Sequence, residues 1–580
     1  MATFTVSRGA PSSAPPSPTA VIDEQALDSV VGKVHSNRER WARTSVTERI
    51  ALLERVIDDT MAAGEAWVDE ATRQKAIPAG SPAVGEEWHS GPALVARMAR
   101  LLRNSLRDIE KHGRPQLPGD LKTGPDGRVI APVFPNDIYD RLLFPSSSGE
   151  VWMPPGRSGD EVLAAQAWAY RGDGQTPVVE LVLGAGNIAS LAPRDVLYSM
   201  FVENRVAVLK CNPVNDYLAP HWEKSFRALI DHGVLEIING DAAVGAYLVR
   251  HPQVEHIHIT GSDKTFDSVV FGPGEDGAAR KARGERLVDT PVTAELGNVS
   301  PIIIVPGRWS ASDIRYHARH VATMLAHNGG FNCISSRIVV TAANWPQRAE
   351  FLDEVERALG VLPARSAYYP GAESRHAAFL ERHPDAAQVG ERREGALPWT
   401  FVRDCDPADA TEPCFTTEAF CSLMGETALP GDTAGEFLDH ATAFCNDTVW
   451  GTLGVTIVVK DQRDKDVAAA MERTVRDLRY GSVCVNIWMG LAFGLTVTSW
   501  GAYPGHPDSD IQSGRGVVGN TYMLRDPEKA VVRAPFRFRP APAWFAGNKN
   551  GARALRALSA MEAHPSPGNL AKLFAAALRP

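Results

Sequence analysis

The chain has 580 residues, about twice the size at which one hydrophobic core stops growing, so we expect at least two folded domains. Apolar residues make up 44% and charged residues 22%, and these values exclude an intrinsically disordered or a fibrous chain. The 60 basic and 69 acidic side chains give a net charge of −9 without a long Lys/Arg run, which argues against a nucleic-acid partner.

Localisation is indicated by three further features. No apolar stretch approaches the roughly 18 residues that a membrane-spanning helix needs, so no membrane partner is expected. The seven cysteines have no paired spacing, which indicates a reducing, cytoplasmic environment and not a disulfide framework. Residues 1–35 begin with a Pro/Ser/Ala-rich stretch that lacks the apolar core of a signal peptide, and are predicted to be a disordered tail.

Two helices follow the predicted tail. Ser45 and Glu48 have the spacing of a capping box, and apolar residues recur after them at helical spacing. A second helix is predicted over residues 93–109. Residues 113–177 are rich in Gly and Pro, which favours irregular surface hairpins in an insertion or an oligomerisation arm.

Strands and helices alternate from residue 178 onward. Strands are predicted over residues 178–183, 206–209, 235–238 and 254–260, with helices over 191–203, 221–231 and 242–250 between them. Strands separated by such helices form βαβ units with a parallel sheet. Further strands over 301–305, 338–341, 455–459 and 482–487 predict a second α/β domain.

A glycine-containing loop joins the first of these strands to its helix. Gly184, Gly186 and Asn187 lie in a G-x-G-x-x-A pattern, which has the placement of a dinucleotide fingerprint. The next strand ends in Lys210 and is followed by no carboxylate that could bind ribose hydroxyls. The ordinary dinucleotide interpretation is therefore weak for this loop alone.

The strand over 254–260 carries polar residues with two interpretations. His256 and His258 alternate on one face, but no third ligand of suitable spacing lies nearby, so we interpret them as sheet-face histidines and predict no metal site. Thr260, Gly261 and Ser262 follow between a strand and a helix, where backbone N–H groups can point at a phosphate.

Cys333 lies in a small polar loop between a helix predicted over 314–326 and a strand. A lone cysteine is more often a small buried apolar residue than a nucleophile. Glu295 and Glu418 change this interpretation when they are considered with Cys333, although each carboxylate alone is more often a solvated or helix-capping acid.

In order and spacing these residues resemble the aldehyde dehydrogenase superfamily, over roughly residues 40 to 525. Asn187 and Lys210 are 23 residues apart, as are the family's oxyanion asparagine and cofactor lysine. Glu295-Leu296-Gly297 resembles its general-base motif, Cys333 its nucleophile, and Glu418-Ala-Phe420 its E-x-F motif. The resemblance implies an α/β fold of the aldehyde dehydrogenase type, with two Rossmann-type domains and an oligomerisation arm.

The resemblance also implies an activity, namely oxidation of an aldehyde to a carboxylic acid by NAD or NADP. Cys333 would attack the aldehyde and form a thiohemiacetal and then a thioester. Asn187 would bind the oxyanion, and Glu295 would activate the hydrolytic water.

The implied cofactor contacts involve Lys210, Gly261, Ser262, Leu296, Glu418 and Phe420. Lys210 and Glu418 would hold the two riboses, and the turn at 261–262 would face the pyrophosphate. NAD-preferring members often carry a glutamate where this chain has Pro213, so both NAD and NADP stay open.

The resemblance divides the chain into regions. Residues 36–297 would form a cofactor-binding domain that includes the arm at 113–177, and residues 298–500 a catalytic domain. Residues 501–535 would return to the oligomerisation and cofactor region, and residues 536–580 form an extension without a family counterpart. A homodimer or homotetramer is implied.

Two alternatives stay open. A CoA-acylating or acyl-reductase member would pass the acyl group to CoA or an acyl carrier and not to water; such members commonly lack the glutamate found here at Glu295. A non-catalytic relative would act as a binding protein, but it would have no need to retain Cys333, Glu295 and Asn187 together. The chain departs from the family at Phe331, which stands where a glutamine is usual, and at Asn298, which replaces a glycine.

Overall fold

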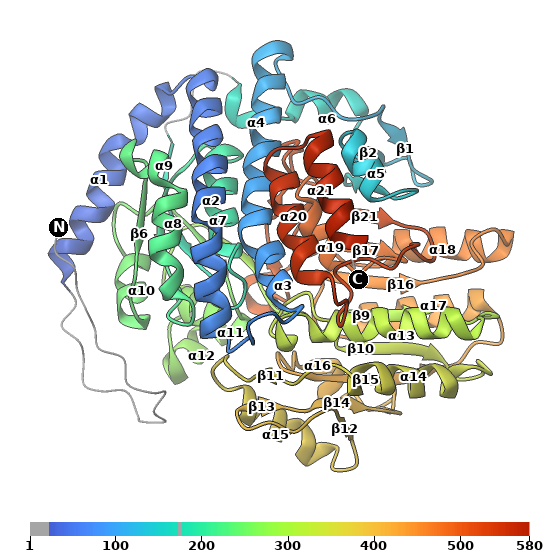
Figure 1. Ribbon diagram of the computed structural model, residues 1–580. Helices are drawn as coiled ribbons and strands as arrows, with labels where there is room; N and C mark the ends of the chain where they lie inside the picture. Colours follow the sequence, from blue (N-terminus) through green and yellow to red (C-terminus); the bar gives the residue numbers. More distant parts are fainter. Residues whose placement is uncertain (1–22, 172–176, 579–580) are drawn as a thin grey trace.

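The computed structural model describes residues 23–171 and 177–578, and two β-sheets form its framework (Figure 1). The smaller sheet has six strands in the order β19-β8-β7-β4-β5-β6, and the larger has eleven in the order β1-β2-β3-β21-β17-β16-β9-β10-β15-β14-β12. The predicted fold class, two α/β units, is confirmed.

The smaller sheet contains the four strands predicted between residues 178 and 260. Its strands are β4 (Val179–Leu183), β5 (Val206–Lys210), β6 (Leu235–Ile238), β7 (His256–Thr260), β8 (Val292–Glu295) and β19 (Gly514–Arg515). All pair in parallel except β19, which is antiparallel to β8. The carboxyl ends of five strands therefore lie along one edge of the sheet.

Helices connect these strands as expected. They are α7 (Leu191–Phe201), α8 (Ala219–Ser225), α9 (Arg227–Asp231), α10 (Ala242–Val249), α11 (Asp263–Val270) and α12 (Gly274–Arg283). The single helix predicted over 221–231 is interrupted at Phe226. This residue has a φ of −103° and ψ of 16° and a fully buried side chain, so the chain turns there to place the ring in the core.

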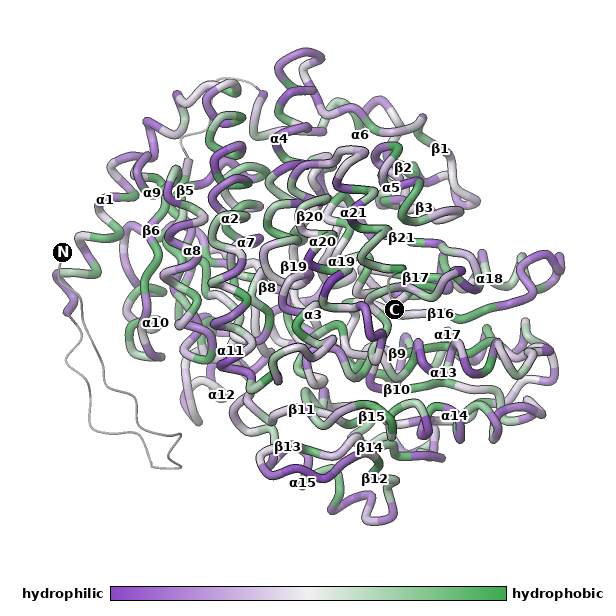
Figure 2. Tube along the Cα trace, in the orientation of Figure 1, coloured by the Kyte–Doolittle hydropathy of each residue, from purple (hydrophilic) through white to green (hydrophobic). Residues whose placement is uncertain are grey.

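The larger sheet has a buried parallel centre. Its central strands are β9 (Pro301–Ile304), β10 (Ile338–Ala342), β15 (Leu423–Leu429), β16 (Gly454–Val458) and β17 (Ser482–Val485). The strands β9, β10 and β16 are buried at every position, and Figure 2 shows β10 and β16 as mostly hydrophobic. Parallel strands covered on both faces require this continuous apolar composition.

Helices and edge strands complete the second unit. The helices are α13 (Ala311–Ala326), α14 (Arg348–Gly360), α15 (Ala372–Arg382), α16 (Pro413–Thr416), α17 (Ala434–Asp447), α18 (Lys465–Asp477) and α19 (Gly490–Leu495). Strand β14 (Trp399–Val402) pairs with β15, and β12 (Ala387–Val389) forms the edge of the sheet beside β14. Two short pairs, β11 (Arg365–Ser366) with β13 (Ala396–Leu397) and β18 (Ser499–Trp500) with β20 (Val518–Gly519), lie outside both main sheets.

Residues 113–177 contain antiparallel strand pairs, as the predicted hairpins require, but these strands are regular and two of them are largely buried, not irregular and on the surface. It forms β1 (Lys122–Thr123), β2 (Val129–Phe134), β3 (Ser148–Trp152), α5 (Ile138–Leu143) and α6 (Gly159–Ala165). The strand β3 pairs with β21 (Lys529–Arg533), and β21 pairs in parallel with β17. The apolar residues of β2 and β3 are buried in this extension of the larger sheet, which is why they adopt strands despite the many turn residues around them.

The predicted disordered tail over residues 1–35 is wrong in its second part, since helix α1 extends from Glu24 to Arg43; residues 1–22 lie outside the described residues. Asp23 accepts a hydrogen bond from the Ala26 N–H and caps the helix. Val31, Val34 and Trp41 are fully buried, and this apolar face holds the helix on the protein.

A helical layer covers the front of the molecule in Figure 1. It comprises α2 (Val46–Gln74), α3 (Val84–Trp88), α4 (Leu94–His112) and the C-terminal helices α20 (Gly551–Ala563) and α21 (Pro567–Leu578), which lie beside α4. Helix α2 has the predicted capping box at Ser45 and Glu48. Among the described residues, no helix combines the length and the apolar composition that crossing a bilayer requires.

Candidate active site

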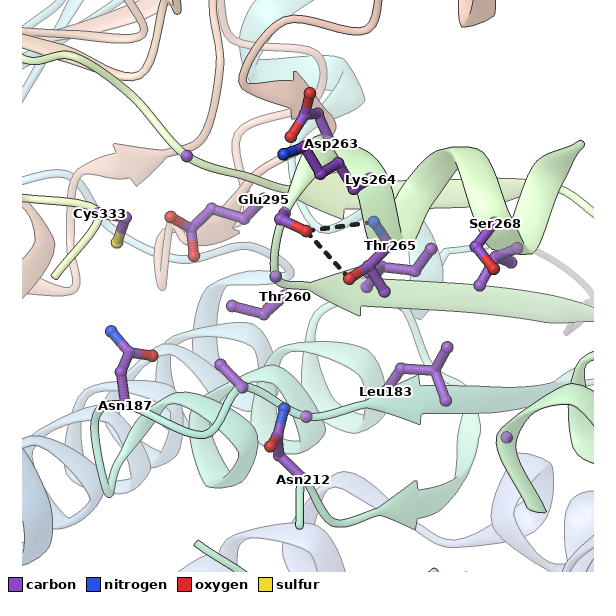
Figure 3. Close-up of a pocket in the computed structure, with 18 of the residues that line it drawn as sticks. Leu183, Asn187, Asn212, Thr260, Asp263, Lys264, Thr265, Ser268, Glu295 and Cys333 are labelled. Atoms are coloured by element: carbon purple, nitrogen blue, oxygen red, sulfur yellow. Dashed lines mark hydrogen bonds between the residues drawn. The ribbon is translucent and has the colours of Figure 1, made fainter. Parts of the chain in front are cut away.

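A cavity of about 910 Å³ lies at the carboxyl edge of the smaller sheet (Figure 3). The ends of four parallel strands contribute Leu183, Lys210, Thr260 and Glu295, while Cys333 comes from the second unit. Figure 3 shows Asn187 and Cys333 at one end of the cavity and Ser268 at the other. Ligands of open α/β sheets bind at this edge, and the volume lies within the usual range for cofactor pockets.

Cys333 and Glu295 are neighbours at the inner end of the cavity. The Cys333 thiol is half-buried and lies within hydrogen-bonding reach of the Glu295 carboxyl group. Glu295 is 3% exposed, and its Oε1 has no hydrogen-bond partner among the described residues. An unpartnered carboxylate oxygen beside a thiol is free to accept a proton or to orient a water molecule.

Burial sets the protonation of this pair. Burial raises the pKa of Glu295 to about 7, and the Cys333 thiol lowers it in part. Burial also raises the pKa of the Cys333 thiol well above 9, and the carboxylates of Glu295 and Glu418 add to this effect. At neutral pH the thiol is therefore protonated and Glu295 is close to half ionised.

Asn187 approaches the nucleophile loop from the turn after β4. Its Nδ2 donates to the carbonyl oxygen of Phe331 at 2.9 Å, two residues before Cys333. Its own carbonyl oxygen accepts from Lys75 Nζ at 3.2 Å, Asn328 Nδ2 at 3.1 Å and Tyr368 Oη at 3.0 Å. In Asn187, the predicted oxyanion residue, the side-chain amide thus already donates one hydrogen bond, and the backbone carbonyl accepts three.

The network behind Asn187 was missed by sequence reasoning. Lys75 and Glu87 are buried and form an ion pair at 2.8 Å, and Lys75 Nζ also donates to Asn328 Oδ1 at 3.0 Å. Lys75 lies 112 residues before Asn187 in the chain, and no local motif marks it. Asn328 lies in the loop that contains Cys333 and could have been suspected from that position alone.

The outer part of the cavity contains the predicted phosphate turn. The Gly261 N–H is already committed to the carbonyl of Glu295 at 3.1 Å, and Ser262 Oγ accepts from the Thr265 N–H at the start of α11. The first N–H groups of α11 have no acceptor inside the helix and open to the cavity at Asp263 and Lys264. An anion would therefore be bound by the first N–H groups of α11 more than by the Gly261 N–H.

Basic side chains line the same region. Lys210 is 7% exposed, and burial lowers its pKa. Arg250 and Lys264 also line the cavity, and sequence reasoning missed both. Lys264 lies two residues after Ser262, so its place near the Thr-Gly-Ser turn could have indicated it.

Glu418 lies at the inner part of the cavity, opposite Gly297. A side chain at Gly297 would place its first carbon 2.1 Å from Glu418 Oε2, so any larger residue there would displace the Glu418 carboxylate. Burial raises the pKa of Glu418 to about 7, and Glu418 Oε1 has no hydrogen-bond partner among the described residues. This oxygen is available for a hydroxyl donor.

Phe420 and Leu296 differ in their placement. Phe420 lines the cavity, and Arg375 Nη2 donates to its carbonyl oxygen at 3.1 Å. Leu296 does not line the cavity, because its side chain is fully buried and its N–H donates to the Ser513 carbonyl. Gly297, one residue later, takes the position at the wall that sequence reasoning gave to Leu296.

The two histidines of strand β7 are committed to other partners. His256 Nδ1 lies 2.7 Å from Glu180, and His258 Nδ1 lies 2.9 Å from Thr293 Oγ1. These contacts agree with their interpretation as sheet-face histidines.

A second, smaller cavity of about 30 Å³ lies on the other side of Cys333. Its lining is largely apolar and includes Leu94, Ile334, Trp488 and Trp544. Burial lowers the pKa of His89, which also lines it, to about 4, so this imidazole is neutral at physiological pH. Trp544 belongs to the extension predicted over 536–580, and its presence beside Cys333 had no sequence signal.

Comparison with protein families gives a partial match. Residues 199–370, less than half of the chain, match the model of the aldehyde dehydrogenase family. This span contains Lys210, the Thr260–Ser262 turn, Glu295 and Cys333.

Two curated proteins are similar to parts of the chain. Geranial dehydrogenase of Castellaniella defragrans is 25% identical over 280 residues, which cover 46% of this chain and 52% of that protein. Aldehyde dehydrogenase LUC3 of a Fusarium species is 24% identical over 160 residues, which cover 28% of this chain and 30% of that protein. The matches thus span about half or less of the length of these relatives.

Solved structures share the fold over most of the chain. NADP-dependent glyceraldehyde-3-phosphate dehydrogenase from Bacillus halodurans, complexed with NADP, has a TM-score of 0.57 and 17% identity, covering 88% of this chain and 91% of that one. The indole-3-acetaldehyde dehydrogenase of P. syringae, complexed with NAD+, has a TM-score of 0.58 and 18% identity, covering 88% and 89%. At these identities the likeness establishes the fold alone.

Proposed function

We propose that this chain is a divergent member of the aldehyde dehydrogenase superfamily and that it oxidises an aldehyde to a carboxylic acid with NAD+ or NADP+. The observation that carries the proposal is the pairing of Cys333 with a buried Glu295 at the inner end of a cofactor-sized cavity.

The cavity suits a dinucleotide in charge and in shape. The basic groups of Arg250 and Lys264, together with the start of α11, would hold the phosphates, and Lys210 would hold one of the riboses. The unpartnered Glu418 Oε1 would accept from ribose hydroxyls, beside the wall that Gly297 leaves open. Position 213 is occupied by a proline and not by a glutamate, so the side chain at this position would not repel the 2′-phosphate of NADP.

Glu295 would prepare the nucleophile. The raised pKa of Cys333 means that the thiol must lose its proton during attack, and the neighbouring Glu295, with a pKa of about 7, is the base within reach. The Cys333 sulfur would then form a bond to the aldehyde carbon and give a thiohemiacetal.

Asn187 would stabilise the oxyanion of that adduct. One hydrogen of its amide is donated to Phe331, which leaves the second for the substrate oxygen, and its backbone is fixed by Lys75, Asn328 and Tyr368. A donor in such a position contributes about 3 kcal/mol to lowering the barrier.

Completion of the reaction requires a hydride acceptor and a water molecule. The oxidised nicotinamide supplies the hydride acceptor when bound. Glu295, after passing the Cys333 proton to solvent, would take a proton from water as the water attacks the Cys333 thioester, which releases the carboxylic acid and the Cys333 thiolate. This second use of Glu295 favours water over CoA as the acyl acceptor.

The small apolar cavity on the far side of Cys333 would receive the aldehyde's side chain. Its volume of about 30 Å³ and its Trp488 and Trp544 walls favour a small apolar group. A cytoplasmic location and a homodimer or homotetramer remain predictions. Because β21 and β3 extend the larger sheet within one chain, association would need a surface other than the edge of β17.

The proposal is tested by following cofactor reduction with purified protein, an aldehyde panel and NAD+ or NADP+ in turn. Wild type is expected to reduce at least one cofactor, and Cys333→Ala to lose turnover. Cys445→Ala is the control, because Cys445 is buried in α17 outside both cavities. Reduction by Cys333→Ala at the wild-type rate would contradict the proposal, and a CoA thioester product on addition of CoA would favour the acylating alternative.

A further inference from the structure

Four potential metal ligands meet outside the candidate active site. His383, Cys405, Glu412 and Cys414 each offer one ligand atom, and these atoms all lie within 4.8 Å of one another. Cys405, Glu412 and Cys414 are buried, at 4%, 3% and 3% exposure, and His383 is partly exposed. None of the four lines either cavity beside Cys333.

Two parts of the chain bring the four residues together, namely the end of α15 and the connection from β14 to β15. His383 follows the last residue of α15, and Cys405 follows strand β14. Glu412 caps α16 and Cys414 lies in its first turn. The ligands thus join a helix end, a strand end and the loop that connects β14 to β15.

The ligand types fit zinc. Two thiols, one imidazole and one carboxylate are ligands that Zn²⁺ takes in four-coordinate structural sites, with bonds of about 2.0–2.3 Å. Such bonds separate tetrahedral ligand atoms by about 3.3–3.8 Å, which follows from the bond lengths. His383 Nε2 and Glu412 Oε1 are 2.9 Å apart, so small shifts of the four side chains would close the shell.

The thiols gain little from their present protein partners. The Cys405 thiol has a distant carbonyl contact, to Val402 at 4.0 Å, and a contact with the Cys414 thiol, which also contacts Glu412. The two thiols and the Glu412 carboxylate are thus buried side by side, with the partly exposed His383 imidazole next to them. A divalent cation would take both thiolates and the carboxylate as ligands.

We propose that His383, Cys405, Glu412 and Cys414 bind one structural zinc ion. The site would fix the loop between β14 and β15, which continues through α16 into Glu418 four residues after Cys414. Phe415 of the same loop accepts a hydrogen bond through its carbonyl oxygen from the backbone N–H of Trp450, at 2.8 Å. The metal site itself does not depend on the proposed function.

The sequence does not reveal this site. The cysteines are nine positions apart, not in a C-x₂-C pair, and the histidine lies 22 residues before the first of them. The expectation of no metal site came from His256 and His258, which have no third ligand of suitable spacing nearby.

Metal analysis of the purified full-length protein tests the proposal. We expect about one zinc per chain in the wild type, and loss of zinc in Cys405→Ser and in Cys414→Ser. Cys445→Ser is the matched control because it removes a buried thiol elsewhere, and Cys333→Ala excludes binding at the other cavity; both should keep the metal. Retention of zinc in both serine variants of the site would overturn the proposal.

Cobalt substitution gives a readout that does not need folded variants. Wild type and Cys333→Ala, refilled with Co²⁺, should both show the thiolate-to-cobalt charge-transfer absorption of a cysteine-ligated site. No such absorption, or a Cys405–Cys414 disulfide in peptides mapped without reduction from freshly purified protein, would overturn the proposal.

Discussion

Glu295 has an unusual environment for a carboxyl group, since it is buried beside the Cys333 thiol and its pKa is raised to about 7. A base must be ionised to act, so the rate of the step that it catalyses should rise with pH through about 7 and level off above it. Removal of this base in Glu295→Gln is expected to lower kcat by about 10²–10⁴-fold and to abolish that rise.

The measurement is kcat against pH for both proteins, with Glu285→Gln as the control. Glu285 is an exposed surface carboxylate paired with Arg283, so its variant should keep the wild-type profile. A wild-type profile that is flat between pH 6 and 8 would contradict the assigned role.

The same raised pKa has a consequence for stability. The protonated Glu295 fits its buried site, so its contribution is fully present below its ordinary value of 4.5 and is lost as the pH rises through about 7. The uncharged Glu295→Gln variant should therefore gain thermal stability relative to wild type at pH 8 but not at pH 4.5. An equal difference in Tm at both pH values would show that ionisation of Glu295 is not the cause.

At the scale of elements, the C-terminal extension contributes to the small cavity through Trp544. Replacing this indole by a methyl group in Trp544→Ala should enlarge the space beside Cys333 and raise kcat/KM for bulkier aldehydes relative to small ones by about tenfold or more. Phe574→Ala is the control, since Phe574 lies on α21 of the same extension and is 43% exposed. An unchanged aldehyde preference in Trp544→Ala would show that the extension does not take part in substrate selection.

The extension is also held to the body by buried charges. Glu562 of α20 lies 2.7 Å from Arg97 and 2.9 Å from Arg100, both on α4, and Arg97 also pairs with Asp140. Burial alone would raise the pKa of Glu562, but the two guanidinium groups lower it below its ordinary value of 4.5. The stabilisation is therefore present above pH 4.5 and is lost as the pH falls.

Removal of one partner from such a network leaves buried charges uncompensated. Glu562→Gln is expected to lower the free energy of unfolding by about 3–5 kcal/mol at pH 7, measured by denaturant titration. Arg556 lies on α20, as Glu562 does, but it forms an exposed ion pair with Glu65 of α2. The substitution Arg556→Gln should therefore change the free energy of unfolding by less than about 1 kcal/mol. Equal effects of the two substitutions would contradict the structural role of the buried network.

The elements that could be predicted well are those that depend on residues close to one another in the sequence. Ser45 caps α2 as expected, because the capping box requires only residues three positions apart. The strand β3 was missed because its pairing with β21 joins residues nearly four hundred positions apart, and nothing in the Gly/Pro-rich stretch encodes that partner. Helix α1 was not predicted, because most of its residues are polar and its apolar face consists of a few residues, Val31, Val34 and Trp41.

The same distinction applies to the whole molecule. Cys333, Glu295 and Asn187 could be identified because their motifs have a fixed order along the chain, and the fold brings them to one end of a cavity. Lys75 and Trp544 could not, because only the tertiary packing of α2 and of the C-terminal extension places them near the site. The two units themselves followed from length and from the βαβ pattern.

The central claim, that Cys333 carries the acyl group of an oxidised aldehyde, is tested most directly by trapping the thioester. Glu295→Gln, which should hydrolyse it slowly, is mixed with an aldehyde that wild type oxidises and with the oxidised cofactor, and then quenched in acid. Mass spectrometry should show the protein heavier by the aldehyde minus two hydrogens, with the addition on the peptide that contains Cys333 and only when cofactor is present. An acyl group on another residue, or no adduct while cofactor is being reduced, would contradict the account.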